Sequence, residues 1–208
     1  WNPNVVYQVG AAGGKEVKEN NIAAWLTPAL NIHRSPLCGR NFEYYSEDPL
    51  LAGVLAGAMV KGIQSQGVAA TVKHFALNNK ETDRKHSDSR VSERAAREIY
   101  LKAFEYVIKG AKPWAVMSSY NIINGCYASE NKELLEDILR DEWGFDGMVT
   151  TDWWTLGEHY KEVKAGNDMK MACGDPKRLK EAMDQGLLTR QDLEHCAERV
   201  LNLILKLD

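Results

Sequence analysis

The stretch GFDGMVTTDWW, residues 144–154, holds residue types that can carry out chemistry. A short apolar run ends in a single carboxylate, Asp152, and two tryptophans follow it directly. A carboxylate can serve as a nucleophile or as a proton carrier, and aromatic rings stack on the C–H faces of a pyranose. An isolated aspartate after a strand is also a common helix cap, and the flanking tryptophans are what favour a sugar site.

Polar and aromatic residues gather in three segments that precede this one in the chain. Lys73 and His74 end the β-rich run VAATVKHFA, and Arg40 lies in the dense cluster RNFEYYSEDP. Met117 and Tyr120 end a third run. Taken alone, the lysine and histidine fit a buried pair with satisfied hydrogen bonds, and the arginine cluster fits a solvated loop. Together with the carboxylate, they predict a pocket with an acid, a cation, an imidazole and aromatic rings.

Other kinds of site are not supported by the spacing of residues. The histidines outside that pair show no HExxH or other metal spacing, so we expect no metal. A Gly-x-Ser-x-Gly elbow is absent and no cysteine–histidine pair is indicated, which argues against a serine or cysteine nucleophile. No motif calls for a cofactor, and we expect none.

The elements that must position these residues alternate along the chain. Apolar or β-rich runs predict strands, and amphipathic runs predict helices, two of them capped by Ser92 and Thr189. The predicted strands cover residues 25–30, 68–76, 115–120 and 148–152, and the predicted helices cover residues 50–64, 92–110, 131–142, 176–185 and 189–205. Strands that alternate with helices indicate parallel β/α units.

The chemistry-bearing residues come at the ends of predicted strands. This favours a (β/α)8 TIM-like barrel, in which functional groups cluster at the carboxyl ends of the strands. An open doubly wound sheet also fits the alternation, but it would carry a glycine-rich phosphate turn after its first strand, and the chain has none. A full barrel usually takes ~250 residues. We therefore expect one α/β domain over residues 1–208, most of a barrel that is incomplete at its N-terminal end.

The composition is that of an ordinary globular domain and gives no sign of nucleic-acid or membrane binding. Of 208 residues, 44% are hydrophobic and 26% are charged, with a formal net charge of −3 and no basic run for an anionic partner. The apolar stretches are shorter than the ~18 residues of a membrane-spanning helix. The four cysteines are widely separated, which predicts free or buried thiols. Localisation stays open, with the cytoplasm slightly favoured over secretion.

Four ordered motifs resemble the barrel domain of family 3 glycoside hydrolases, in particular the β-glucosidase group. They are WLTPALNIHRSPLCGRNFEYYSEDP, KHFALNNKETDR, MSSYNIINGCYASEN and GFDGMVTTDWW, and the resemblance runs from about residue 20 to about residue 172. A lone KHF would be a weak signal, but several motifs in the same order are highly specific. The resemblance implies a glycosidase that releases terminal β-D-glucose from β-glucosides or short oligosaccharides.

The resemblance also implies roles for single residues. Asp152 matches the family nucleophile, whose carboxylate attacks the anomeric carbon and forms a glycosyl-enzyme intermediate that water releases with retention. The matches that would bind hydroxyls of the innermost sugar are Arg40, Lys73 and His74, and those that would line the same subsite are Met117, Tyr120 and Trp153.

Some features of the family are missing from the sequence. The early aspartate in a DGP-like motif does not occur, and the loop ALNNKETDRKHSDS lacks the GHGDT-like motif that supplies a catalytic histidine in the N-acetylglucosaminidase branch. His86 lies in that loop but does not match the motif, and Ala172 stands where proline is usual. A retaining mechanism needs a second carboxyl group ~5–5.5 Å from the first. We expect a glutamate from a domain outside this chain to supply it.

Two interpretations of different classes remain. In the first, the chain is the larger part of the catalytic barrel of a retaining β-glucosidase. In the second, it is a non-catalytic sugar-binding or structural fragment that keeps the pocket and lacks the acid. A glutamate on neighbouring sequence would separate the two. Within the enzyme class, a β-xylosidase or another exo-glycosidase is the alternative, and the difference lies in how the pocket treats the hydroxymethyl group of the sugar.

Overall fold

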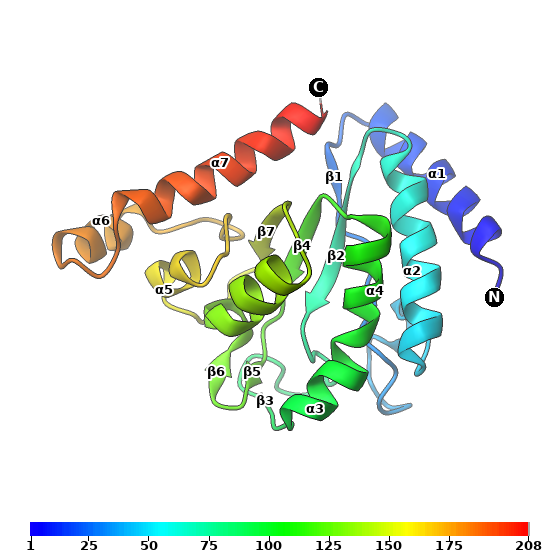
Figure 1. Cartoon of the computed structure of the whole chain (residues 1–208), viewed down its shortest axis with the longest axis horizontal. Helices are drawn as coiled ribbons and strands as arrows, with labels where there is room; N and C mark the ends of the chain where they lie inside the picture. Colours follow the sequence, from blue (N-terminus) through cyan, green and yellow to red (C-terminus); the bar gives the residue numbers. More distant parts are fainter. Residues whose placement is uncertain (208) are drawn as a thin grey trace.

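A parallel β-sheet forms the centre of the molecule (Figure 1). The computed structural model describes residues 1–207. The sheet order is β1 (Ala24–Trp25), β2 (Ala69–Phe75), β4 (Ala115–Ser118), β7 (Met148–Thr151), and every neighbouring pair is parallel. The strands therefore follow one another in chain order without a reversal, as in a β/α barrel and unlike a doubly wound sheet. These four strands correspond to half of the eight that close a complete barrel.

The strands predicted at residues 68–76, 115–120 and 148–152 are confirmed with shorter bounds, whereas β1 begins one residue before the predicted run 25–30 and covers only its first residue. The run predicted at residues 25–30 pairs with β2 as β1 and again through an isolated bridge between Ala29 and Lys73. After β7, a second bridge joins Thr150 to Met169, so the chain returns alongside the last strand of the sheet.

Helical segments connect consecutive strands. The segment between β1 and β2 is α2 (Pro49–Gln64), and the segments between β2 and β4 are α3 (Glu93–Ala95), the π-helical η2 (Ala96–Tyr100) and α4 (Lys102–Ala111). The π-helical η4 (Glu133–Glu142) precedes β7. Ser92 caps α3 as predicted, because its hydroxyl accepts a hydrogen bond from the backbone N–H of Ala95 at 3.3 Å.

No prediction covers the first helix, α1 (Pro3–Glu19), which contains three glycines. The helix packs along α2, and Figure 1 shows α1, α2 and α4 side by side. A Cβ atom added at Gly10 would lie 2.6 Å from the carbonyl oxygen of Met59, so the glycine lets the two helix backbones approach closely.

Three helices follow β7: α5 (His159–Lys164), α6 (Pro176–Asp184) and α7 (Arg190–Leu207). The last two match the predicted helices, and no predicted helix covers α5. Thr189 caps α7 as expected, since its hydroxyl accepts a hydrogen bond from the N–H of Asp192 at 3.2 Å. None of the helices within residues 1–207 is long and apolar enough to cross a membrane.

A second, small sheet joins the loops that follow β2 and β4. It consists of β3 (Asp88–Ser89), β5 (Ile122–Ile123) and β6 (Cys126–Tyr127). β5 and β6 form a hairpin around Asn124 and Gly125, whose φ angles of 49° and 91° suit a type I′ turn. The 3-10 turns η1 (Asn41–Glu43) and η3 (Ala128–Glu130) complete the irregular segments.

The apolar core lies between the sheet and the helices that cover it. Phe75 of β2 is fully buried and makes edge-on contacts with Phe104, at 5.1 Å between ring centroids, and with Trp143, at 5.9 Å. Within residues 1–207, all four cysteines are free thiols, as predicted from their wide separation in the sequence.

Candidate active site

Asp152 follows the last residue of β7 and is held from two sides. Its backbone N–H donates to the carbonyl of Ser118, at the end of the neighbouring strand β4, at 3.2 Å. Its carboxylate oxygen Oδ1 accepts the N–H of Trp153 at 2.7 Å. Asp152 is only 7% exposed, so a buried carboxylate with a fixed orientation lies at the carboxyl end of the sheet.

His74 faces the other oxygen of this carboxylate. The imidazole Nε2 lies 3.6 Å from Asp152 Oδ2. The backbone of His74 is fixed by Asn31, which both donates to its carbonyl and accepts from its N–H, each at 2.9 Å. Burial, together with the positive charges of Arg40, Lys73 and Arg84, lowers the pKa of His74 well below its usual value, so the imidazole is neutral.

Lys73 and Arg40 converge on one carboxylate, Glu43. The Nζ of Lys73 lies 3.7 Å from Glu43 Oε2, and Arg40 makes an ion pair with Glu43 Oε1. Burial lowers the pKa of Lys73, with a further contribution from the charge of Arg40. Burial also acts to lower the pKa of Arg40, but the hydrogen bond and charge of Glu43 outweigh it and the net shift is upward.

An irregularity in β2 explains how two consecutive residues serve the same site. Neighbouring residues of a regular strand point to opposite faces of a sheet. The register between β2 and β4 shifts between Val72 and Phe75, and Lys73 and His74 lie within this shift. Such an irregularity re-aims side chains next to active sites. Lys73 therefore reaches Glu43 while His74 reaches the carboxylate at the end of β7.

Tyr120 connects β4 with the residue after Asp152. Its hydroxyl donates to the carbonyl of Trp153 at 2.7 Å. Burial, reinforced by the negative charge of Asp152, raises the pKa of Tyr120 to about 12, so the hydroxyl remains a donor. The Arg84 guanidinium lies 4.6 Å from the centroid of the Tyr120 ring, and Lys85 Nζ lies 5.0 Å from it.

The remaining predicted residues have less direct connections. Met117 is 2% exposed and lies in β4 directly opposite Thr150, two residues before Asp152. Trp153 is half-buried, and its backbone joins the Asp152 carboxylate to Tyr120. Within residues 1–207, the side chains of histidine, cysteine, aspartate and glutamate form no cluster able to hold a metal ion.

Some residues of the site were not predicted as such. Glu43 is the meeting point of the two cations. The sequence places it in the dense cluster that also holds Arg40 but gives it no role. Asn31 and Arg84 lie in loops whose polar residues look solvated in the sequence. Their contacts with His74 and Tyr120 arise from the tertiary structure.

A family model described as Glycosyl hydrolase family 3 N terminal domain matches residues 1–203. The chain belongs to this family. The family 3 chain is 66% identical over 194 residues to β-glucosidase A of Butyrivibrio fibrisolvens, a match that covers 93% of the chain and 23% of that relative. It is 45% identical over 207 residues to the exo-α-(1→6)-L-arabinopyranosidase of Bifidobacterium longum, with 99% of the chain and 27% of the relative covered.

Solved structures agree with the fold. The structure of β-glucosidase 3B from Thermotoga neapolitana in complex with glucose superposes with a TM-score of 0.96 at 48% identity, covering 99% of this chain and 30% of that one. The predictions of the family and of a barrel-type α/β fold are therefore confirmed. The chain spans about a quarter of the length of the two curated relatives named above.

Proposed function

We propose that this protein is a retaining glycoside hydrolase with Asp152 as its nucleophile, acting on β-glucosides. The observation that carries the proposal is the buried Asp152 carboxylate, oriented by the N–H of Trp153 and facing His74 at 3.6 Å. The carboxylate attacks the anomeric carbon as the bond to the leaving group breaks, which gives a covalent glycosyl-enzyme ester. Water then attacks the same carbon and returns the carboxylate, with net retention.

The surrounding side chains would bind the sugar being released. Lys73 and Arg40 supply charged donors for its hydroxyl groups, and such hydrogen bonds are stronger than neutral ones. The neutral imidazole of His74 adds a hydrogen bond, and its Nδ1 has no hydrogen-bond partner within residues 1–207. Met117, Tyr120 and Trp153 would form the wall of the same subsite.

The general acid/base is proposed to come from outside this chain. Retaining glycosidases need a second carboxyl group that protonates the leaving group and then activates water. Glu43 is an unsuitable candidate because it is already engaged by both Arg40 and Lys73. We therefore propose that the single domain of residues 1–208 works with a glutamate on another domain.

The identity of the sugar has one specific alternative. The protein is 66% identical to a relative named a β-glucosidase, which favours terminal β-D-glucose. It is also 45% identical to a relative named an exo-α-(1→6)-L-arabinopyranosidase. Arabinopyranose lacks the hydroxymethyl group of glucose, so a pentopyranosidase is the second candidate, with the same nucleophile.

Covalent trapping tests the proposal. The protein is incubated with 2,4-dinitrophenyl 2-deoxy-2-fluoro-β-glucoside, whose leaving group needs little protonation, so trapping does not depend on the acid. We expect intact-mass analysis to show one fluoroglucosyl group and peptide mapping to place it on Asp152. The corresponding fluoroxyloside, used in parallel, ranks the two sugar classes by their trapping rates.

The controls are two Asp→Asn variants. Asp152→Asn should take up no label, whereas Asp146→Asn, at an exposed position before β7, should be labelled like the wild type. A label on another residue would contradict the assignment of Asp152. No label in a protein shown to be folded would favour a non-catalytic sugar-binding role.

A further inference from the structure

The turn that follows Asp152, residues 153–157, has a strained backbone. Trp154 has a φ of 53°, in the left-handed region that bulky residues rarely adopt. Its side chain is not held in the core, since the residue is 64% exposed. Strained residues of this kind persist only where their surroundings hold them, and they concentrate at functional sites.

Hydrogen bonds to its backbone groups hold the first half of this turn. The N–H of Trp154 donates to the carbonyl of Met171 at 2.9 Å, and its carbonyl accepts from Lys85 Nζ at 3.0 Å. The carbonyl of Trp153 accepts from the Tyr120 hydroxyl. The peptide groups next to the nucleophile are therefore tied to three different segments of the chain.

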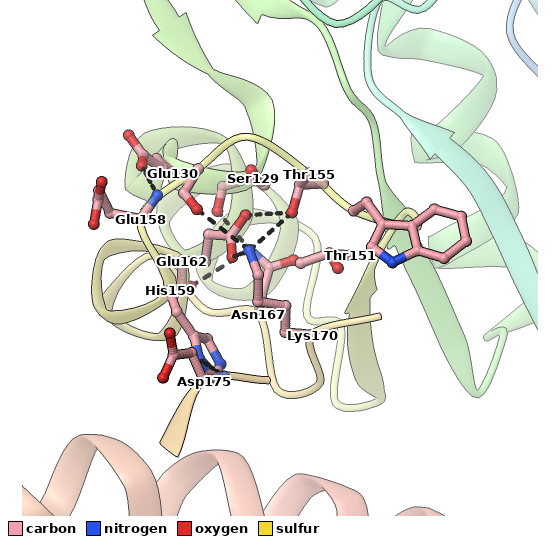
Figure 2. A network of polar contacts seen from close by, with 12 residues as sticks. Ser129, Glu130, Thr151, Thr155, Glu158, His159, Glu162, Asn167, Lys170 and Asp175 are labelled. Atoms are coloured by element: carbon pink, nitrogen blue, oxygen red, sulfur yellow. Dashed lines mark hydrogen bonds and ion pairs between the residues drawn. The ribbon is translucent and has the colours of Figure 1, made fainter. Parts of the chain in front are cut away.

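A buried ion pair holds the second half through Thr155 (Figure 2). The Thr155 hydroxyl donates to Glu162 Oε1 at 2.6 Å and accepts from Lys170 Nζ at 3.1 Å. Lys170 also donates to the carbonyl of Gly157 at 3.3 Å and makes an ion pair with Glu162, which is 1% exposed. Figure 2 shows Thr155, Glu162 and Lys170 pointing toward one another from three segments.

Both functions of the hydroxyl are needed at this position. A hydroxyl group can donate one hydrogen bond while accepting another, so it fits between a carboxylate and an ammonium group. The turn is also packed tightly against the carboxylate of Glu162, because a Cβ added at Gly157 would lie 2.6 Å from Glu162 Oε1. A buried ion pair adds little net stability compared with an apolar pair of equal volume. A role in fixing the turn accounts for its presence here.

We propose that Thr155, Glu162 and Lys170 are positioning residues that fix the orientation of the Asp152 carboxylate; this rests on the proposed function of Asp152. Asp152 Oδ1 accepts the N–H of Trp153, so the orientation of that peptide group sets the orientation of the carboxylate. Thr155 lies only three residues after Asp152. If its anchor is lost, the strained Trp154 can relax toward an ordinary φ. This rotates the peptide between Trp153 and Trp154 and, through the backbone of Trp153, shifts the Trp153 N–H.

Three variants test this on the trapping reaction. Thr155→Val keeps the shape and removes the hydroxyl, Thr155→Ser keeps the hydroxyl, and Thr189→Val removes a comparable bond from the hydroxyl to Asp192 at the start of α7. We expect the maximal trapping rate of Thr155→Val to fall about tenfold with little change in the affinity for the fluoroglucoside, because a misplacement of ~1 Å can cost on the order of 10²-fold. Thr155→Ser should restore the rate.

The control separates positioning from stability. Thr189→Val should lower the melting temperature and leave the trapping rate unchanged, since its hydroxyl only caps a helix. A Thr155→Val protein that traps at the wild-type rate, or a Thr155→Ser protein that is equally slow, would overturn the proposal. Wild-type protein that takes no label on Asp152 would instead refute the proposed function itself, whatever the variants do.

A second background addresses the strain directly and serves also if Thr155→Val alone does not fold. Glycine adopts a left-handed φ without steric cost, so Trp154→Gly removes the tendency of this residue to relax. We expect Thr155→Val to slow trapping less in the Trp154→Gly background than in the wild type, with the Trp154→Gly protein as reference. An equal or larger loss in that background would contradict the link between the anchor and the strained residue.

Discussion

His74 shows how burial sets the charge of a residue in the site. Its imidazole is 1% exposed, and the cations Arg40, Lys73 and Arg84 disfavour protonation although Asp152 lies nearby. A neutral imidazole does not form an ion pair with the Asp152 carboxylate. The same burial connects this residue to stability, because an unfolded chain would let it titrate near its ordinary pKa of about 6.5.

We expect His74 to lower the free energy of unfolding at acidic pH. Its folded pKa is lowered, so its contribution is fully present above the unfolded pKa of about 6.5 and is lost as the pH falls below it. The free energy of unfolding should drop by up to about 1.4 kcal/mol per pH unit from this group, and His74→Gln should show a flatter dependence. Urea unfolding at about pH 7.5, 6.5 and 5.5 measures both proteins.

His159 provides the internal check on this comparison. Burial and the charge of Lys170 also lower its pKa, and this contribution is the same in the wild type and in His74→Gln. The difference between the two proteins therefore isolates His74. Identical pH slopes would show that the pKa of His74 is the same in the folded and unfolded states.

At the scale of elements, the contact between α1 and α2 depends on glycines. A Cβ added at Gly62 would overlap with the carbonyl oxygen of Tyr7 and lie 2.8 Å from the N of Ala11. We expect Gly62→Ala to lower the free energy of unfolding by about 1–3 kcal/mol, because the helices must move apart. Thermal and urea unfolding measure the loss.

Gly57, in the same helix, is the matched control. A Cβ there would lie 3.7 Å from the Cβ of Ala111, an ordinary contact. Gly57→Ala should leave the free energy of unfolding unchanged or raise it by up to about 1 kcal/mol, since alanine favours helix formation. Equal losses in both variants would mean that the loss does not come from the close approach of α1 at Gly62.

The glycines of α1 explain why this helix was not predicted. The segment from Pro3 to Glu19 contains three glycines, which disfavour a helix when the chain is considered alone. Their role, which is to allow the close approach to α2, becomes visible only in the tertiary structure. The strands that carry the site were easier to predict, because apolar runs that end in Lys73–His74 or Asp152 combine a structural and a chemical signal.

The contacts among site residues were harder to predict than the residues themselves. Asp152, His74 and Tyr120 do lie together, as the barrel prediction requires. The role of Glu43 depends on how a 3-10 turn meets the end of β2, and the pairing of Glu162 with Lys170 depends on how α5 packs. Neither geometry follows from local sequence patterns.

At the scale of the whole molecule, an ion network joins segments that are distant in the sequence. Arg140 of η4 donates to Asp168 Oδ2 at 2.8 Å and to the carbonyl of Gly147 at 2.9 Å. Asp168, whose side chain is fully buried, also pairs with Arg199 of α7 at 3.2 Å. The network thus fastens the C-terminal helix to the sheet, since Asp168 accepts the N–H of Val149 in β7 as well.

We expect Arg140→Met to destabilise the fold strongly. Removing Arg140 leaves the buried charge of Asp168 with only Arg199 and the N–H of Val149 as partners. The loss of one partner from a buried ion pair costs up to about 3–5 kcal/mol. Arg97→Met is the control, because Arg97 pairs with Glu142 of the same helix η4 at the surface and should cost less than about 1 kcal/mol. Urea unfolding compares the two, and similar losses would contradict the importance of burial.

The small sheet of β3, β5 and β6 limits how the loops after β2 and β4 can move. The loops after β2 and β4 are joined there by the N–H of Ile122, which donates to Ser87 at 2.9 Å, and by the side chain of Asn124, which bonds both backbone groups of Val91. The two loops cannot swing independently, as separate flaps would. They form one hydrogen-bonded unit, so a movement of one loop is transmitted to the other.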